Sequence, residues 1–452
     1  MSAFVYHKLL IPIMNKLALL IASFVTMLCP QGLCAQENSR QVLTLDQLFA
    51  LADQNSKSLR PATTAINESE QAIKVARQAQ LPDINASISA SFLGNGCLIE
   101  RDLSSGIKAP IPHWGNNFAL EVSQVIYAGG AISGGIKLSK LQAEQARLAL
   151  AKDRNTVHFL VLGYYLDLFK QQNLLSVYEQ HIARTRQVLE DMRARSAEGI
   201  MLKNDVTRYE LLLAQLELVR TQIANTLTIL RQDLTTTLGM PEGTIILPDT
   251  TLLTQVMPKD GQDYWQNTAL SNSPELQQTD LSVQMNRQQE KITRAERRPQ
   301  IAFVATNHFD GPITIEVPPI DRNFNYWYVG VGVKYNISSL FKTPKAVRRQ
   351  QLATRRSLET ADNAREQIGL AVHEGYIRYL EAFEQLHTQE KSVELARENY
   401  AVIFHRYTNE LALVTDMLDA SNACLQAEVE RSNARINILY HYYKLHYLSG
   451  TL

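Results

Sequence analysis

The sequence is short of the residues that mark several classes of protein. Its 452 residues include four cysteines, too few for a disulfide scaffold. Glycine and proline number 20 and 15, which excludes collagen-like and low-complexity chains. Basic and acidic residues balance at 45 each, and no basic cluster interleaves with aromatics, so we expect no nucleic acid partner. The hydrophobic fraction of 45% is enough for a packed core.

Long apolar runs are also missing, apart from a short one near the start. A positive residue, an apolar run and a small-residue cleavage site predict a signal peptide over residues 1–35, cut near Ala35. The signal is better formed when translation begins at Met14. Leu33 precedes Cys34 where a lipobox needs a small residue, which argues against lipidation. No later segment could form a membrane helix, so any contact with a membrane would need a barrel or a surface.

The remaining chain repeats itself once. Three segments recur in the same order, 217 or 211 residues apart: 54–59 at 271–276, 75–84 at 292–301, and 199–205 at 410–416. The repeated unit is about half the mature chain, much longer than a solenoid repeat. We therefore predict a first structural repeat over residues 36–240, a connector over 241–262 that is rich in proline and glycine, and a second repeat over 263–452.

Each repeat shows the same order of helical and strand-like segments. A helical stretch comes first, at Thr44–Gln80 and Tyr264–Arg298. Two alternating runs follow in each half, which predicts strands at about 83–93, 116–127, 300–309 and 326–336. A very long helical stretch with one interruption closes each repeat, at Gly130–Leu238 and Lys342–Leu448.

The length of these helices limits the architecture. Ser133 to Glu198 spans 66 residues without a proline, which is on the order of 100 Å of helix. Leucine, isoleucine and valine recur at coiled-coil spacing between Leu212 and Leu234, so the next stretch should pack along a partner. Helices this long must lie against others of similar length.

The four strands leave two readings open, a half-buried sheet in a soluble domain and a share of a membrane barrel. Known membrane barrels need about 8 strands or more, and an open sheet in lipid would leave its edges unpaired. Strands in a membrane would therefore require several chains. Two chains would give eight strands and an interior filled by side chains, so an aqueous channel favours three or more chains.

Several short segments carry a resemblance to a known family. They are 81–89 (LPDINASIS), 124–130 (QVIYAGG), 297–303 (RRPQIAF), 407–420 (YTNELALVTDMLDA) and the ending 449–452 (SGTL). In this ordered, duplicated set the chain resembles the TolC-like outer membrane efflux proteins over nearly its whole mature length.

The resemblance implies a mainly α fold with a transmembrane β part. It implies a homotrimer with a shared 12-stranded β-barrel in the bacterial outer membrane, in contact with lipid, and a coiled-coil α-barrel reaching into the periplasm. Such proteins are passive exit ducts of tripartite efflux pumps or type I secretion systems. They open at the periplasmic tip on docking with an adaptor (membrane fusion) protein and an inner-membrane transporter of the RND or ABC type. They have no catalysis and no cofactor.

The resemblance also assigns residues near the tip. Asp416 and Asp419 correspond to the aspartates of the periplasmic aperture, and their i, i+3 spacing places them on one helix face. The alternative is a pair of solvated surface acids. Asp205 and Tyr407 correspond to a closed-state tether. Ala412 stands where the family has an arginine, so one closing link is absent.

The two helix turns are implied to face the adaptor. The residues concerned are Gly199 and Ile200 in the first turn and Glu410 and Leu411 in the second. Glu410 replaces the glycine expected at that place. The resemblance identifies neither the exported substrate nor the partner pump.

The sequence leaves two other functions to be considered. A soluble periplasmic coiled-coil interaction protein without a channel would also carry long helices, and membrane partitioning would separate the two. A secreted hydrolase would need a site, and the sequence has no HExxH motif, no cysteine–histidine ligand cluster and no nucleophile elbow. We therefore expect no metal site. Cys97 and Cys424 would lie too far apart to form a disulfide.

Overall fold

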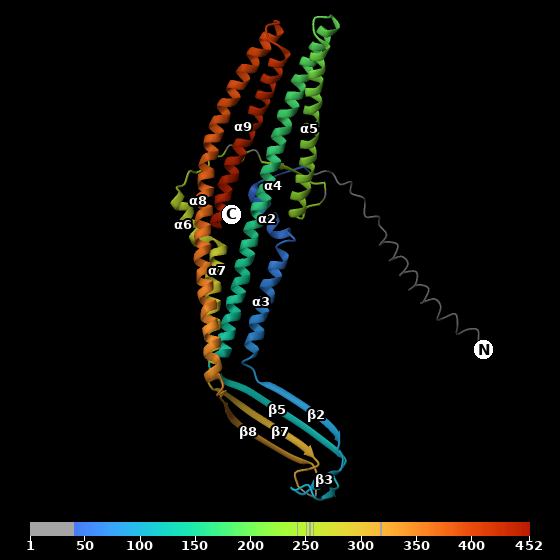
Figure 1. The fold of residues 1–452 in the computed structure, drawn as a ribbon, viewed down its shortest axis with the longest axis vertical. Helices are drawn as coiled ribbons and strands as arrows, with labels where there is room; N and C mark the ends of the chain where they lie inside the picture. The colour runs from blue at the N-terminus through green and yellow to red at the C-terminus, as the bar shows by residue number, and fades with distance from the viewer. Residues whose placement is uncertain (1–39, 242, 250, 253–254, 256, 317–318) are drawn as a thin grey trace, which may run out of the picture.

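The structure is a computed structural model that describes residues 40–452 apart from 242, 250, 253–254, 256 and 317–318. The predicted signal peptide lies outside the described residues. The molecule is elongated, with a sheet at one end and the ends of two helical hairpins at the other (Figure 1). The C-terminus returns to the middle of its length (Figure 1).

One antiparallel sheet forms the lower end of the molecule. Its order is β2-β5-β7-β8, which leaves β2 and β8 as the edges. Both edge strands expose their apolar residues, with Ile88 85% and Val331 64% accessible, because no second layer of the described chain covers this sheet. The strands overlap the four runs expected from the alternation, and their bounds are β2 Asp83–Phe92, β5 Trp114–Ala128, β7 Gln300–Gly311 and β8 Phe324–Lys334. A small hairpin of β3 (Gly96–Ile99) and β4 (Gly106–Ala109) joins β2 to β5.

Four long helices form two hairpins that run away from the sheet. They are α4 Ala131–Ala197 and α5 Lys203–Thr237 in the first, and α8 Ser339–Thr408 and α9 Val414–Ser449 in the second. The hairpins lie side by side because α4 packs against α9. Near its start, α8 contains Pro344. Among the described residues, no helix has both the length and the hydropathy to cross a membrane.

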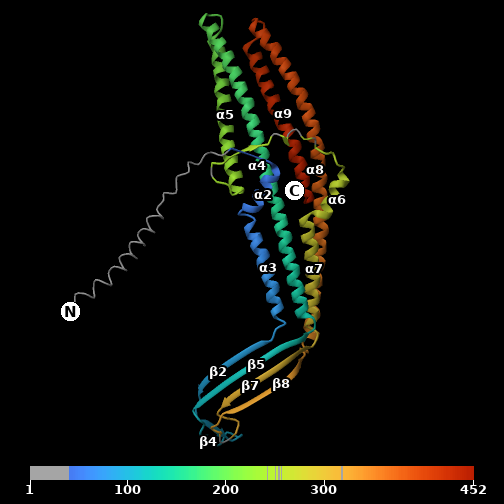
Figure 2. The same cartoon turned by 180° about the vertical axis from the view of Figure 1, so that it is seen from behind.

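Four shorter helices line the long ones. They are α2 Leu45–Asn55, α3 Arg60–Gln78, α6 Gln262–Asn272 and α7 Pro274–Ala295. Of these, α3 runs beside the lower part of α4 and α7 beside the lower part of α8, as the view from behind also shows (Figure 2).

The short helices correct one expectation from the sequence. Each initial helical stretch was expected to be continuous, but each is broken at a buried serine, Ser56 or Ser273, with ψ of 121° and 116°. The N–H of each serine still bonds a carbonyl of the preceding helix, at 2.9 and 3.0 Å. Pro61 and Pro274, which favour the start of a helix, begin the helices that follow. The breaks lie 217 residues apart, at matching places in the two repeats.

The largest hydrophobic core lies at mid-length, where chain segments cross the helices. β1 (Arg40–Leu43) pairs in parallel with β6 (Ile245–Pro248), α2 packs against α4, and α6 packs against α8 and α9. Two buried tyrosines of the long helices form hydrogen bonds with the segments that cross them. The Tyr165 hydroxyl donates to the Leu43 carbonyl at 2.8 Å, and the Tyr379 hydroxyl to the Pro258 carbonyl at 2.7 Å. A second, smaller core fills the space between the hairpins near their tips.

Candidate functional site at the helical tips

Both hairpins turn with the same backbone at their tips. In the first, the Ile200 N–H bonds the Arg195 carbonyl at 3.0 Å, and in the second the Leu411 N–H bonds the Arg406 carbonyl at 2.7 Å. This bond spans the end of a helix and closes it over a left-handed residue. The bonded positions are 211 residues apart, so the repeat expected from the sequence extends to the hydrogen bonds of the two turns.

The left-handed residue differs between the turns. Gly199 has a φ of +78° and Glu410 has a φ of +60°. A residue with a Cβ is disfavoured in this region by about 1–2 kcal/mol, whereas glycine is not. Glu410 therefore stores strain at a place where the first turn has none.

Each tip exposes two apolar side chains. Ile200 and Leu411, expected from the sequence, are 61% and 68% accessible. Sequence reasoning missed Leu202 and Leu413, which are 72% and 69% accessible and immediately precede α5 and α9. The available signal was a leucine in the N-cap position, where polar residues are normally preferred. Exposed apolar groups gathered on a turn are typical of a contact surface.

The two aspartates expected at an aperture lie together on the exposed start of α9. A carboxylate oxygen of Asp416 accepts the Leu413 N–H at 3.0 Å and so caps the helix. Asp419 lies one turn further on and is also exposed. Neither carboxylate makes an ion pair with another described residue, so both charges face solvent.

Asp205 and Tyr407 lie at the same end of the molecule but are not joined by a hydrogen bond. Tyr407 is 5% exposed, and its hydroxyl has no hydrogen-bond partner among the described residues. Burial raises the pKa of the Tyr407 hydroxyl, Arg195 lowers it, and the carboxylates of Asp191 and Asp205 raise it.

A cleft of about 430 Å³ lies between α4 and α8 beside Tyr407. Tyr400 and Phe404 form its α8 wall, and Arg184 and Asp191 belong to its α4 wall.

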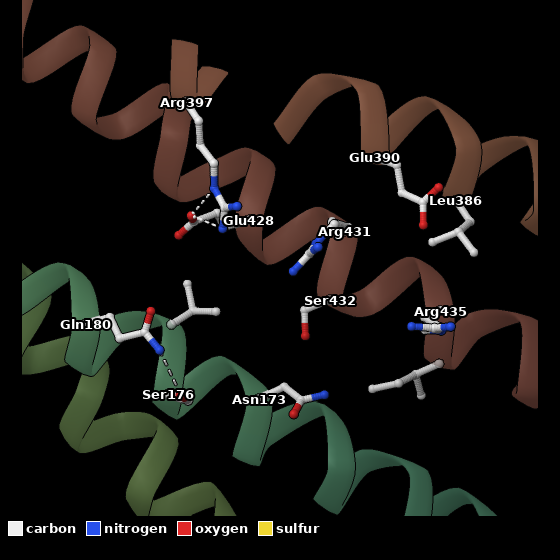
Figure 3. Close-up of a pocket in the computed structure, with 12 residues that line it drawn as sticks. Asn173, Ser176, Gln180, Leu386, Glu390, Arg397, Glu428, Arg431, Ser432 and Arg435 are labelled. Carbon is white, nitrogen blue, oxygen red and sulfur yellow. Dashed lines mark hydrogen bonds and ion pairs between the residues drawn. The ribbon is translucent and has the colours of Figure 1, made fainter. Parts of the chain in front are cut away.

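Below the tips, an ion pair joins α8 to α9. Arg397 reaches across to Glu428, with a nitrogen–oxygen distance of 2.7 Å (Figure 3). It lies in a groove of about 340 Å³ whose α4 side is polar (Figure 3). Glu428 is 6% exposed, so its carboxylate depends on Arg397 for compensation. Arg186 and Glu217 form the matching pair in the first hairpin at 2.5 Å, but there both side chains are well exposed.

One buried hydrogen bond connects the two hairpins. His181 of α4 and Ser421 of α9 are joined at 3.1 Å between the imidazole Nε2 and the hydroxyl. Burial lowers the pKa of His181, and the nearby Arg184 lowers it further, while Glu428 acts in the opposite direction. Burial at the contact between the hairpins therefore favours the neutral imidazole.

The two tips present charged and apolar side chains to solvent. In the part of the chain that the structure describes, no group of three His, Cys, Asp or Glu side chains is placed to hold a metal ion. Both described cysteines are free, Cys97 exposed and Cys424 buried.

Comparisons with known proteins agree with this architecture. The model of a family described as outer membrane efflux protein matches residues 48–239 and 265–451, one segment in each half. A comparison with curated proteins finds no match.

Solved structures share the fold at low sequence identity. The outer membrane protein VceC of Vibrio cholerae has a TM-score of 0.73 at 14% identity, over 90% of this chain and 96% of that one. The CmeC outer membrane channel of Campylobacter jejuni gives 0.72 at 14%, over 90% and 85% of the chains. The MtrE outer membrane channel of Neisseria gonorrhoeae, in its open state, gives 0.71 at 14%, over 90% and 88%.

Proposed function

The chain belongs to the outer membrane efflux protein family, and we propose that three copies form a passive exit duct that opens at the helical tips when a periplasmic partner docks. It is an outer membrane efflux protein with a helical periplasmic extension. The observation that carries the proposal is the separation of its two ends: an uncovered sheet with free edges at one, and exposed carboxylates on paired hairpins at the other.

The sheet supports association of the chains. Its edge strands β2 and β8 have no neighbour on their outer sides in the described chain, and their apolar residues are exposed. In a membrane such edges must pair. Pairing β8 of one copy with β2 of the next closes the sheet, and three copies give a barrel of twelve strands that can hold water.

The aspartates support a cation-binding constriction. In a three-fold assembly Asp416 and Asp419 would place six carboxylates around one axis. Such a ring favours cations and binds multivalent ones most strongly, which makes the pore easy to block.

The tether is proposed to form when the tips close. The Tyr407 hydroxyl, which has no hydrogen-bond partner among the described residues, would be the donor and the Asp205 carboxylate the acceptor. Because Ala412 offers no cation, we propose that His181–Ser421 contributes to holding the two hairpins together, while Arg397–Glu428 holds α8 against α9 within the second hairpin.

The exposed turns are proposed to receive the adaptor. Gly199, Ile200, Glu410 and Leu411 would form the contact, together with the newly identified Leu202 and Leu413. The energy would come from an inner-membrane transporter of the RND or ABC type in a tripartite efflux pump or type I secretion system. The duct itself would carry out no catalysis.

Two measurements test the proposal. Native mass spectrometry of protein extracted from outer membranes should give three chains, whereas a monomer in the soluble periplasmic fraction would favour an interaction protein without a channel. In planar bilayers the protein should conduct ions and be blocked by hexaamminecobalt(III). The double substitution Asp416→Asn and Asp419→Asn should weaken that block by about tenfold or more.

A matched pair provides the control for the block. Glu384→Gln with Glu398→Gln removes two exposed charges from α8 away from the tips and should leave the block unchanged. Equal weakening by both pairs would show that the cation responds to overall charge and not to a ring at the aperture.

A further inference from the structure

A cationic cavity lies where the strands end and the long helices begin. It has a volume of about 450 Å³ and is lined from the ends of β5, β7 and β8 and the starts or ends of α4, α7 and α8. Its charged lining residues are Arg298, Lys334 and Lys342, opposed by the single acid Glu296. The cavity is thus built from distant parts of the chain and carries an excess of positive charge.

The three cations are not neutralised by the protein. None of them forms an ion pair with another described residue. Arg298 donates one hydrogen bond, from Nη1 to the Gly129 carbonyl at 2.9 Å, which fixes its position at the turn between β5 and α4. Lys334 and Lys342 are exposed, and their ammonium groups make no hydrogen bond to the described chain. Their donors are therefore free for an anion.

A buried hydroxyl in the lining also has no partner. Ser339 is 4% exposed, and its Oγ makes no hydrogen bond within the described residues. A buried polar group without a partner is unfavourable, and most such groups are satisfied by a bound molecule or by water. The Ser339 N–H already bonds the Asn336 carbonyl at 2.9 Å, so side chains, and not the end of α8, offer the donors.

Exposed apolar side chains lie close in sequence to the lining residues at the start of α8. Ile337, Leu340 and Phe341 are 67%, 40% and 78% accessible, and they lie between or beside Lys334, Ser339 and Lys342 in the chain. A free inorganic anion would use the cations and leave these side chains without a role. An amphiphile would use both.

We propose that this cavity binds the phosphate group of an anionic phospholipid, with its acyl chains lying over Ile337 and Phe341. Lys334, Lys342 and Arg298 would neutralise the phosphate, and Ser339 Oγ would donate a hydrogen bond to it. The inference rests on the proposed function, because it requires the strands to lie in the membrane and the helices to leave it at this level. The site would fix the height of the protein in the inner leaflet.

The test uses the full-length protein purified in detergent. Binding of dihexanoyl-phosphatidylglycerol is followed by native mass spectrometry, with dihexanoyl-phosphatidylcholine and inorganic phosphate as separate probes. The variant Lys334→Gln with Lys342→Gln should weaken phosphatidylglycerol binding on the order of tenfold or more. Ser339→Ala should weaken it by a smaller factor without changing the charge.

A matched charge control comes from the same helix. Lys345→Gln with Arg348→Gln removes two exposed cations that do not line the cavity, and it should change binding by less than about threefold. Equal losses in the two double variants would overturn the site. Full displacement of the lipid by inorganic phosphate at equal concentration would overturn the phospholipid as ligand, and equal binding of phosphatidylcholine would overturn selection of an anionic headgroup.

The channel proposal is read out separately on the same samples. The Lys334→Gln, Lys342→Gln variant should keep its oligomeric mass and its conductance while losing the lipid. Loss of lipid binding with conductance retained supports the site. Retained lipid binding in that variant, with or without conductance, contradicts it. A wild-type protein that is monomeric and does not conduct would refute the duct whatever the lipid result.

Discussion

The two helical hairpins have matching backbones but differ in what their matching residues do. Arg186–Glu217 in the first and Arg397–Glu428 in the second each join the two helices of a hairpin, with partners 31 residues apart. Both side chains of the first pair are exposed, whereas in the second pair the Glu428 side chain is only 7% exposed. The two pairs differ because α4 packs against α9, which carries Glu428. In the described chain α5, which carries Glu217, makes no comparable contact with the second hairpin.

The turns show a second difference of the same kind. The first turn has a glycine where the backbone is left-handed, and the second has Glu410. The second turn also carries a helix cap from Asp416, while no hydrogen bond from Asp205 caps α5 in the described chain. Strain and its compensation are thus concentrated in the hairpin that carries the proposed aperture.

The largest expected effect comes from removing the partner of the buried Glu428 carboxylate. Arg397→Ala should destabilise the second hairpin by about 2 kcal/mol, because it leaves that carboxylate unpaired, and the cost is limited by the 55% exposure of the Arg397 side chain. Arg186→Ala should cost less than about 1 kcal/mol in the first hairpin, because that pair is exposed to solvent. Amide hydrogen exchange along α5 and α9 measures both. Replacing Arg397 and Glu428 together by leucine should recover most of the loss, and equal costs in the two hairpins would contradict the contrast.

The turn residues give the next largest effect, with opposite signs. Glu410→Gly should stabilise the second turn by up to about 1 kcal/mol, because glycine adopts the left-handed conformation without strain. Gly199→Ala should destabilise the first turn by about 1 kcal/mol for the same reason. Amide exchange at Ile200 and Leu411 reports each change. Stabilisation by both substitutions, or by neither, would mean that φ does not decide the result.

The helix cap gives a smaller difference. Asp416→Ala removes the acceptor of the Leu413 N–H and should destabilise the start of α9 by about 0.5–1 kcal/mol. Asp205→Ala should cost only a few tenths of a kcal/mol, through loss of a favourable charge near a helix start. The comparison is made by exchange of the first amides of α5 and α9. Asp416→Asn serves as the control, because asparagine can still cap.

The smallest effect is a dependence on pH at the contact between the hairpins. Burial lowers the pKa of His181 below its ordinary value of 6.5, so the unfolded chain takes up a proton before the folded one does. The contribution of His181 is complete above that value and decreases as the pH falls below it. Exchange protection along α4 and α9 should decrease between about pH 7.5 and about pH 5.5 in the native protein and less in His181→Gln. An unchanged pH dependence in the variant would exclude His181 as its source.

Much of the architecture could be predicted because it depends on long, regular sequence patterns. Alternation over Asp83–Phe92 predicts a strand, and the absence of proline between Ser133 and Glu198 predicts the long helix that the structure confirms. The breaks at Ser56 and Ser273 were missed because serine is not a strong helix breaker, although the following prolines were a usable signal. The repeat bounds at 240 and 263 remain predictions.

The site was predictable by position and not by environment. The matched segments place Gly199 and Glu410 at two turns, and the structure has both turns at one end of the molecule (Figure 1). The burial of Glu428, in contrast to Glu217, depends on which helix of the neighbouring hairpin covers it, and no local sequence encodes that. The roles of Asp416, Asp419 and the Asp205–Tyr407 pair remain proposals for the same reason.

The unbroken length of α8 has a mechanical consequence. A helix of 70 residues is a rod of about 105 Å, and turning such a rod through about 5° about its foot moves its far end by about 9 Å. Pro344 lies close to that foot and has no N–H to bond the preceding turn, which weakens the helix beside the sheet. Leverage of this kind would let the proposed opening at the tip arise from a rotation too slight to disturb the packing beside the sheet.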